Sequence, residues 1–186
     1  MRPHWSKRGL SPSMSNQIYI LKKKETMNCI WSEQAVKGGV KTSHGQFFVN
    51  DDGGRSEAGF KGGAGDCVTR AIAIATKKPY LEVYSALNEA SKSERTGKRK
   101  RGKSSARNGV YKNTIRKYMK SIGWTWVPTM QIGSGCKVHL RGDELPAGRI
   151  VASASKHLVA VIDGVIHDTF DCSRQGKRCV YGYYKK

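Results

Sequence analysis

From about residue 67 to residue 122 the apolar positions of this chain indicate helices, and after residue 122 they recur with a strand period. A glycine-rich loop from Gly62 leads into an apolar, alanine-rich segment that ends at Ala75. This pattern predicts a buried helix with Cys67 on its first turn. A second helix is predicted over 79–91, where apolar residues recur at positions i, i+3, i+4 and i+7. The same spacing predicts a third helix over 111–122, closed by a glycine.

Short apolar runs separated by Gly, Pro and Asp are typical of strands, and several of them follow the third helix. They are 124–127, 136–140, 149–153, 157–162, 165–170 and 179–184. One further short strand is predicted earlier, at 46–49. Because the helices come first and the strands afterwards, the sequence predicts an α+β fold in which N-terminal helices pack on a C-terminal antiparallel sheet.

An Asp-Gly pair at 163–164 joins two of these runs and is a strong signal for a two-residue hairpin turn. In the register that this turn imposes, His157 and Asp168 share one face as diagonal neighbours, with Cα atoms about 7–8 Å apart. By the alternation of side chains, His167 points to the opposite face. Asp171 would also lie on that face if the strand continued, so it is a reserve acid.

Cys67 is the candidate nucleophile. A cysteine on the first turn of a helix lies beside unpaired amide hydrogens and the positive end of the helix dipole, and both favour the thiolate. A buried and inert cysteine is the alternative interpretation of this position. The hairpin favours the nucleophile, because His157 could take the thiol proton while Asp168 orients the imidazole.

These residues resemble those of a known family. Gly65-Asp66-Cys67 opens a helix, and ninety residues after the cysteine a histidine opens a strand whose hairpin partner carries an acid. This order resembles the papain-like cysteine peptidases, and most closely the small papain-like proteins of bacteriophages and integrated elements. The resemblance covers about residues 46–184. It implies a papain-like fold, in which the helix from Cys67 packs against the antiparallel sheet that carries His157.

Two positions depart from the usual residues of that family. Papain-like enzymes carry a glutamine six residues before the cysteine that helps the cysteine's amide to bind the oxyanion, and Lys61 stands at that position here. Lys61 is therefore the oxyanion candidate, as a point charge on a flexible stem. The orienting residue, often an asparagine in the family, is Asp168. Asp66 beside the thiol is expected to cap the helix by accepting hydrogen bonds from backbone amides.

The resemblance and the triad together predict a cysteine hydrolase that cleaves an amide bond, peptide or isopeptide, through an acyl-enzyme. Cys67 would attack the carbonyl, His157 would accept and return the proton, and Asp168 would orient the ring. Deamidation and acyl transfer use the same triad and remain open. The expected partner is a protein or peptide substrate, acidic ones included, and no cofactor is expected.

The charge of the chain points to anionic partners. With 34 Lys and Arg against 14 Asp and Glu, the formal net charge is +20, which favours nucleic acid, acidic proteins or anionic surfaces. Residues 92–107 carry eight basic side chains and one acid. They are predicted to form an exposed loop, either a contact for nucleic acid or acidic substrate or a solvated insertion.

A nucleic-acid-binding protein without catalysis is the alternative function, with aromatic side chains as base-stacking platforms. Core packing is the other interpretation of those side chains, because they recur with strand spacing. The aromatic residues in question are Trp124, Trp126, Tyr181, Tyr183 and Tyr184.

Residues 1–27 are basic and rich in serine, and are predicted to form a disordered arm before a single domain over 28–186. No apolar run approaches the roughly 18 residues of a membrane span, so no membrane partner is expected. The five cysteines are an odd number without a Cys-x-x-Cys pair, so no disulfide framework is predicted. The cytoplasm, of a host cell if the chain is phage-encoded, is the expected compartment.

No metal site is predicted from the sequence. The possible zinc ligands His157, His167, Cys172 and Cys179 match no zinc-site spacing. Residues 50–55 are rich in Asn, Asp and Gly and are predicted to form a turn, without the spacing of an EF-hand calcium loop.

Overall fold

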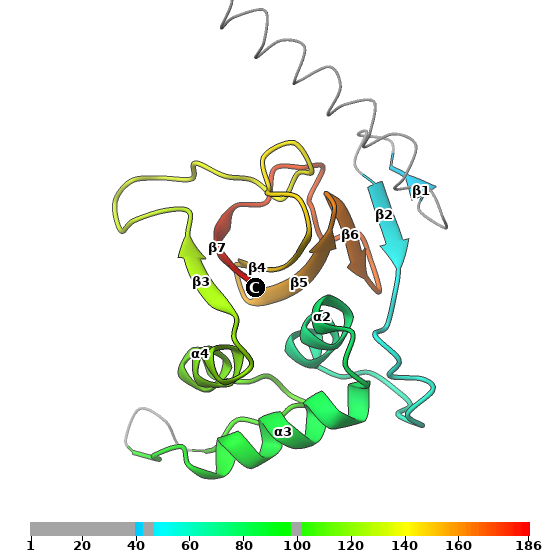
Figure 1. Ribbon diagram of the computed structural model, residues 1–186, viewed down its shortest axis with the longest axis vertical. Coiled ribbons are helices and arrows are strands. Elements are labelled where there is room, and N and C mark those ends of the chain that lie inside the picture. The colour runs from blue at the N-terminus through cyan, green and yellow to red at the C-terminus, as the bar shows by residue number, and fades with distance from the viewer. Residues whose placement is uncertain (1–39, 43–46, 98–101) are drawn as a thin grey trace, which may run out of the picture. The chain divides into compact units, whose positions relative to one another are not determined.

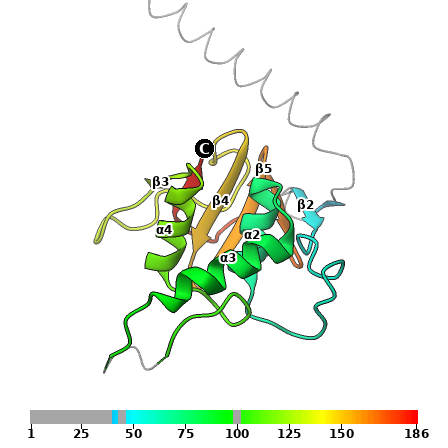
Figure 2. The ribbon, with the colours of Figure 1, turned by 60° about the horizontal axis from the view of Figure 1, so that its bottom comes forward.

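The computed structural model describes residues 40–42, 47–97 and 102–186, all within one compact unit, Gly38–Lys186. The arm predicted at 1–27 lies outside these residues. The described part of the chain is α+β, with a sheet covered on one face by helices (Figures 1 and 2). None of its helices has the length and apolar character needed to cross a membrane.

The three predicted helices are confirmed. They are α2 (Cys67–Thr76), α3 (Tyr80–Lys92) and α4 (Lys112–Ser121). Every residue of α2 from Val68 to Ala75 is buried, which explains why all of them are apolar except Thr69 and Arg70. The sequence predicts that the second helix begins at Pro79. In the structure Pro79 is the N-cap, and α3 begins one residue later, at Tyr80.

Seven strands of the described chain form one sheet in the order β1-β2-β6-β5-β4-β7-β3. Their bounds are β1 (Val40–Lys41), β2 (Phe47–Asn50), β3 (Thr125–Pro128), β4 (Arg149–Ala154), β5 (His157–Ile162), β6 (Val165–Asp168) and β7 (Val180–Lys185). The run predicted at 136–140 forms no strand. Within this run only His139 makes a bridge, to Cys179, which lies just before the start of β7.

The prediction of an antiparallel sheet is wrong at one edge, because β2 pairs with β6 in parallel. The helices and most of the sheet separate these two strands in sequence, so no tight turn restricts their relative direction. The hairpin register itself is confirmed. Ile162 faces Val165, and Ala160 faces His167.

The sheet is buried on both faces. On one face α2 lies against β5 and β4, α4 contacts β3, and α3 packs against both α2 and α4 (Figure 1). On the other face Leu140 and Leu145, from the connection between β3 and β4, cover Ile150 and Val159. Alternate residues of β4 and β5 therefore enter two different cores, which fixes the register of the strand that begins with His157.

The C-terminal end of α2 is held by β4. The Arg149 guanidinium donates to the backbone carbonyl of Ala75 at 2.8 Å and also to that of Ile74. These carbonyls belong to the last turn of the helix, where intrahelical donors are missing. Lys77 then leaves the helix in the left-handed conformation, with φ of 58°.

The basic segment 92–107 is exposed only in part. Arg95 and Lys103 are exposed, whereas Ser104 and Ala106 are buried, so the prediction of an exposed loop is wrong at its C-terminal end. Glu94 accepts hydrogen bonds from the amide and hydroxyl of Ser104 and pins the chain there. Residues 98–101 lie outside the described residues.

The aromatic side chains near the C-terminus belong mainly to the core. Trp124 and Tyr184 are buried, and the ring of Trp126 packs 4.8 Å from that of Tyr184. Rings that are packed in this way offer no open face to a nucleic-acid base. Tyr181 and Tyr183 are half-buried.

Cys136 and Cys179 form a disulfide bond, which the sequence analysis did not predict. The two residues are 43 positions apart and follow no cysteine motif, so only the folded arrangement brings them together. The bridge at His139 is the reason, because it lays the connection before β4 against the start of β7.

Replacing both bonded cysteines by serine is expected to lower the free energy of unfolding by about 2–4 kcal/mol, because the bond closes a long loop in the unfolded chain. Urea denaturation of the Cys136→Ser/Cys179→Ser double variant would measure this. Wild-type protein treated with a thiol reductant should match the variant. Finding both thiols free in a non-reducing peptide map would contradict the assignment.

Candidate active site

Cys67 is the first residue of α2 and is half-buried. Burial raises the pKa of its thiol, but a hydrogen bond with the His157 side chain and one with the Leu158 backbone lower it. The positive charges of His157 and Arg70 act in the same direction. The net result is a thiol pKa below its usual value, which favours the nucleophilic thiolate.

His157 opens β5, and its ring joins the thiol to an acid. Its Nε2 atom lies 2.6 Å from the carboxylate Oδ2 of Asp168, the last residue of β6. A carboxylate only accepts, so Nε2 carries the proton and Nδ1 is left to exchange a proton with a thiol. Burial lowers the pKa of the ring, but hydrogen bonds to Asp168 and to two cysteine thiols raise it to about 11. The structure thus brings together the three residues predicted from the sequence.

Asp168 is only 3% exposed and is held by more than His157. Its Oδ1 accepts from the Arg70 guanidinium at 2.6 Å and from the Thr169 amide at 2.8 Å. Burial raises the pKa of Asp168, but these contacts and those with His157 lower it below its usual value. The carboxylate is therefore fixed as an anion in one orientation, with a single oxygen on the imidazole.

Asp66 does not cap α2, so this prediction is wrong. Its carboxylate, 2% exposed, lies 2.9 Å from Arg55 Nε and 3.1 Å from Arg70 Nε, and it accepts from the Tyr80 hydroxyl at 2.7 Å. An ion pair with Arg55, a charge-assisted hydrogen bond from Arg70 and a hydrogen bond from the Tyr80 phenol outcompete backbone amides for this buried carboxylate. Burial and the Asp66 contact raise the pKa of Tyr80, so it stays protonated as a donor.

The orientation of Asp66 leaves the N-terminal amides of α2 uncapped by a side chain. The first helical hydrogen bond runs from the Arg70 amide to the Asp66 carbonyl at 3.1 Å. The amides of Cys67 and the two residues after it therefore precede the helical ladder. They lie at the positive end of the helix dipole, where an oxyanion is stabilised.

The Lys61 side chain is exposed, and the backbone of this residue accepts a hydrogen bond. Its carbonyl accepts from the Arg55 guanidinium at 3.2 Å, and the carbonyl of Gly62 accepts from the same group at 2.7 Å. Arg55 thereby ties this segment to Asp66, beside the nucleophile. A role for the Lys61 ammonium at the oxyanion stays a prediction.

His167 and the reserve acid Asp171 make their contacts outside the triad. His167 points away from the triad, as predicted, and its Nδ1 lies 3.1 Å from Oδ2 of Asp51. Asp171 accepts from the Ser173 amide at 2.9 Å. Asp51 and Asp52 accept from backbone amides in the turn that follows β2, so the predicted turn is confirmed.

Two further residues border the imidazole, and the sequence analysis gave neither of them a catalytic role. Cys172 is a buried free thiol beside His157 and Asp168, and burial raises its pKa, which keeps it protonated. The ring of Phe170 lies tilted against that of His157, with the ring centres 5.6 Å apart, and Phe170 is 52% exposed. The hairpin register could have identified Phe170, since it places this residue opposite His157.

His157, Asp168 and Cys172 are the described residues that could hold a metal ion, since their ligand atoms lie within 4.8 Å of one another. The zinc ligand set considered from the sequence does not assemble, because Cys179 is bonded to Cys136 and His167 contacts Asp51.

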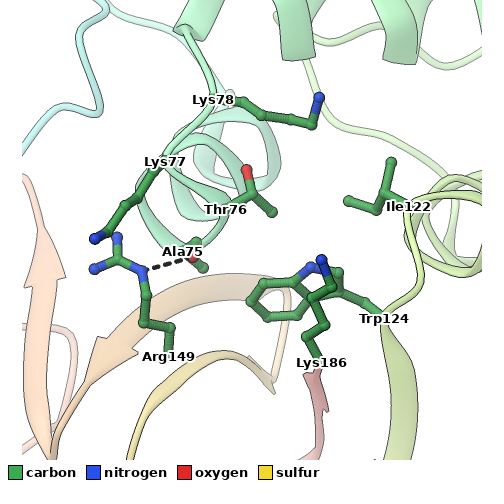
Figure 3. Close-up of a pocket in the computed structure, with 8 residues that line it drawn as sticks. All are labelled: Ala75, Thr76, Lys77, Lys78, Ile122, Trp124, Arg149 and Lys186. Carbon is green, nitrogen blue, oxygen red and sulfur yellow. Dashed lines mark hydrogen bonds between the residues drawn. The ribbon is translucent and has the colours of Figure 1, made fainter.

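A surface pocket of about 340 Å³ lies at the other end of α2, near its C-terminal residues Ala75 and Thr76 (Figure 3). Trp124 forms an apolar wall, and Arg149 is occupied by its hydrogen bond to the helix. Because Cys67 begins the same helix, this pocket is separate from the triad.

Comparison of the chain with protein-family models, with curated proteins and with solved structures found no match.

Asp168→Asn is expected to remove a stabilising contribution that exists only while Asp168 is ionised. The folded pKa of Asp168 lies below its usual 3.8, so this contribution is fully present above that value and is lost as the pH falls through the folded pKa. In urea denaturation the variant should be less stable by about 3–5 kcal/mol at neutral pH, and the difference should shrink as the pH falls below the usual carboxyl pKa of 3.8.

Asp171→Asn is the matched control, because it removes the reserve acid from the same segment. It is expected to change the unfolding free energy by less than about 0.5 kcal/mol at every pH. An acid-dependent loss in this variant, and none in Asp168→Asn, would show that the wrong carboxylate has been assigned to His157.

Proposed function

We propose that this chain is a papain-like cysteine hydrolase that cleaves an amide bond, in a peptide or an isopeptide linkage, through an acyl-enzyme. The observation that carries the proposal is the contact series from the Cys67 thiol through the His157 ring to the Asp168 carboxylate. The arrangement of elements supports it, because the helix that begins at the cysteine packs on the strand that begins with the histidine, as the papain-like resemblance implies.

In the first half-reaction the Cys67 thiolate attacks the carbonyl carbon of the amide, and the electron pair of the C=O bond moves to the oxygen. The uncapped amides at the start of α2 donate hydrogen bonds to this oxyanion. When the C–N bond breaks, the proton on His157 Nδ1 passes to the leaving amine. A thioester on Cys67 remains.

In the second half-reaction water attacks the thioester and gives its proton to His157 Nδ1. The acid product leaves, and the sulfur departs as the thiolate. Asp168 keeps Nε2 protonated throughout, so Nδ1 is always the atom that exchanges the proton. Arg70 acts as a positioning residue, because it holds the carboxylate without touching the reacting atoms. Deamidation would release ammonia in the first step, and acyl transfer would replace water by an amine.

The test is the rate of iodoacetamide labelling of each cysteine from about pH 5 to pH 9, followed by mass spectrometry. Cys67 should label fastest, with a midpoint below the usual thiol pKa of 9.0, because His157 and the helix stabilise its thiolate. His157→Ala removes the hydrogen bond and the positive charge, and should slow the labelling of Cys67 at neutral pH at least about tenfold.

Cys172 supplies the control within the same protein. It borders the same imidazole but is buried, with a raised pKa, so it should label slowly in both wild type and variant. The proposal fails if Cys67 labels no faster than Cys172, or if its rate is the same after His157→Ala.

A further inference from the structure

The turn 105–109 runs alongside the start of α2. The Thr69 hydroxyl donates to the carbonyl of Ala106 at 2.9 Å. At the other end of the turn, a methyl group placed on Gly65 would lie 3.4 Å from the backbone carbonyl of Asn108. The turn therefore runs beside residues 65–69, with Ala106 next to Thr69 and Asn108 next to Gly65. The backbone of the residue between Ala106 and Asn108 lies beside the stretch that contains Cys67. That residue is Arg107.

Several contacts hold this turn in place. The amide of Ser105 donates to the carbonyl of Gly109 at 3.1 Å, and the amide of Asn108 donates to the Ser105 hydroxyl at 3.1 Å. The amide of Ala106 donates to the side chain of Asn88, on α3, at 2.9 Å. The turn is therefore fixed to α2 and to α3, and it presents a defined surface beside the thiol.

Arg107 has no acidic partner among the described residues and is therefore able to bind a group from outside the chain. Ala106 is fully buried, whereas Arg107 is half-exposed, and it forms no ion pair with any described residue. The acids close to it are already paired. Asp66 faces two arginines, and Glu94 accepts from Ser104. A half-exposed guanidinium without an ion-pair partner among the described residues, on a turn that runs alongside the first turn of α2, is suited to bind a carboxylate on the substrate.

We propose that the substrate carries an acidic side chain beside the scissile amide and that Arg107 binds it. The proposal rests on the hydrolase function above and names its substrate class, an acidic peptide segment. Arg107 is then a specificity-determining residue, which contacts the substrate without taking part in the chemistry at Cys67.

The first test compares two reagents that alkylate the same thiolate. Iodoacetate carries a negative charge and iodoacetamide carries none, and in each the sulfur–carbon bond forms as iodide leaves. The ratio of their rates at Cys67 cancels any change in thiol pKa and reports the local potential. Arg107→Gln should lower the ratio of the iodoacetate rate to the iodoacetamide rate about two- to fivefold at low ionic strength. Arg107→Lys keeps the positive charge and should therefore retain most of the wild-type ratio.

Lys117→Gln is the matched control, because it removes one positive charge from an exposed position on α4. It should leave the ratio unchanged. If Cys67 labels fast and Arg107→Gln has no greater effect on the ratio than Lys117→Gln, the inference is overturned while the hydrolase remains. If Cys67 fails to label first in the wild type, the hydrolase itself has failed.

The second test uses peptide pairs that differ only by Glu against Gln at each position around the cleaved bond. The wild type should favour the Glu peptide at one position, and Arg107→Gln should reduce this kcat/KM preference about tenfold, since a charged hydrogen-bonded pair is lost. Equal cleavage of all pairs overturns the proposal. So does a variant that loses affinity for a single-stranded oligonucleotide but keeps the wild-type reagent ratio, because Arg107 would then contact nucleic acid.

Discussion

Arg70 holds the helix that begins at Cys67 against the strand that ends at Asp168. Its guanidinium lies 3.1 Å from Asp66 and 2.6 Å from Asp168, and all three side chains are nearly excluded from solvent. Buried charges of this kind are tolerated only when each has its partners in good geometry, since removing one partner leaves an uncompensated charge. The position of α2 along the sheet is therefore determined by ionic contacts as much as by the apolar core around Ile72.

The same ionic contacts decide what the two carboxylates do. Asp66 is adjacent to Cys67 and could oppose ionisation of the thiol or occupy the helix amides, but Arg55 and Arg70 turn it away from both. Asp168 gives one oxygen to Arg70 and the other to His157. Arg70 thus contacts both acids. With Arg55 it holds Asp66, which would hinder the proposed chemistry, away from the thiol, and it orients Asp168, which would support that chemistry.

The hairpin and its triad face could be predicted from the sequence because the rules involved are local. An Asp-Gly turn sets the register, and alternation of side chains then places His157, Asp168 and His167. The orientation of Asp66 could not be predicted, because its competitors Arg55 and Tyr80 are brought to it by folding. The disulfide and the parallel pairing of β2 also depend on contacts between distant segments. The preference of aspartate for helix caps predicted the wrong role for Asp66, because its buried carboxylate has stronger partners in the two arginines.

The triad is spread widely along the chain, and this has a consequence for the nascent protein. Cys67 leaves the ribosome ninety residues before His157 and about a hundred before Asp168, and Arg70 stays without its strand partner for as long. During that interval the cysteine is an ordinary thiol on an incomplete domain. The contacts with His157 that lower the pKa of the Cys67 thiol form only when the C-terminal hairpin docks on α2, so an unfinished or prematurely ended chain lacks them.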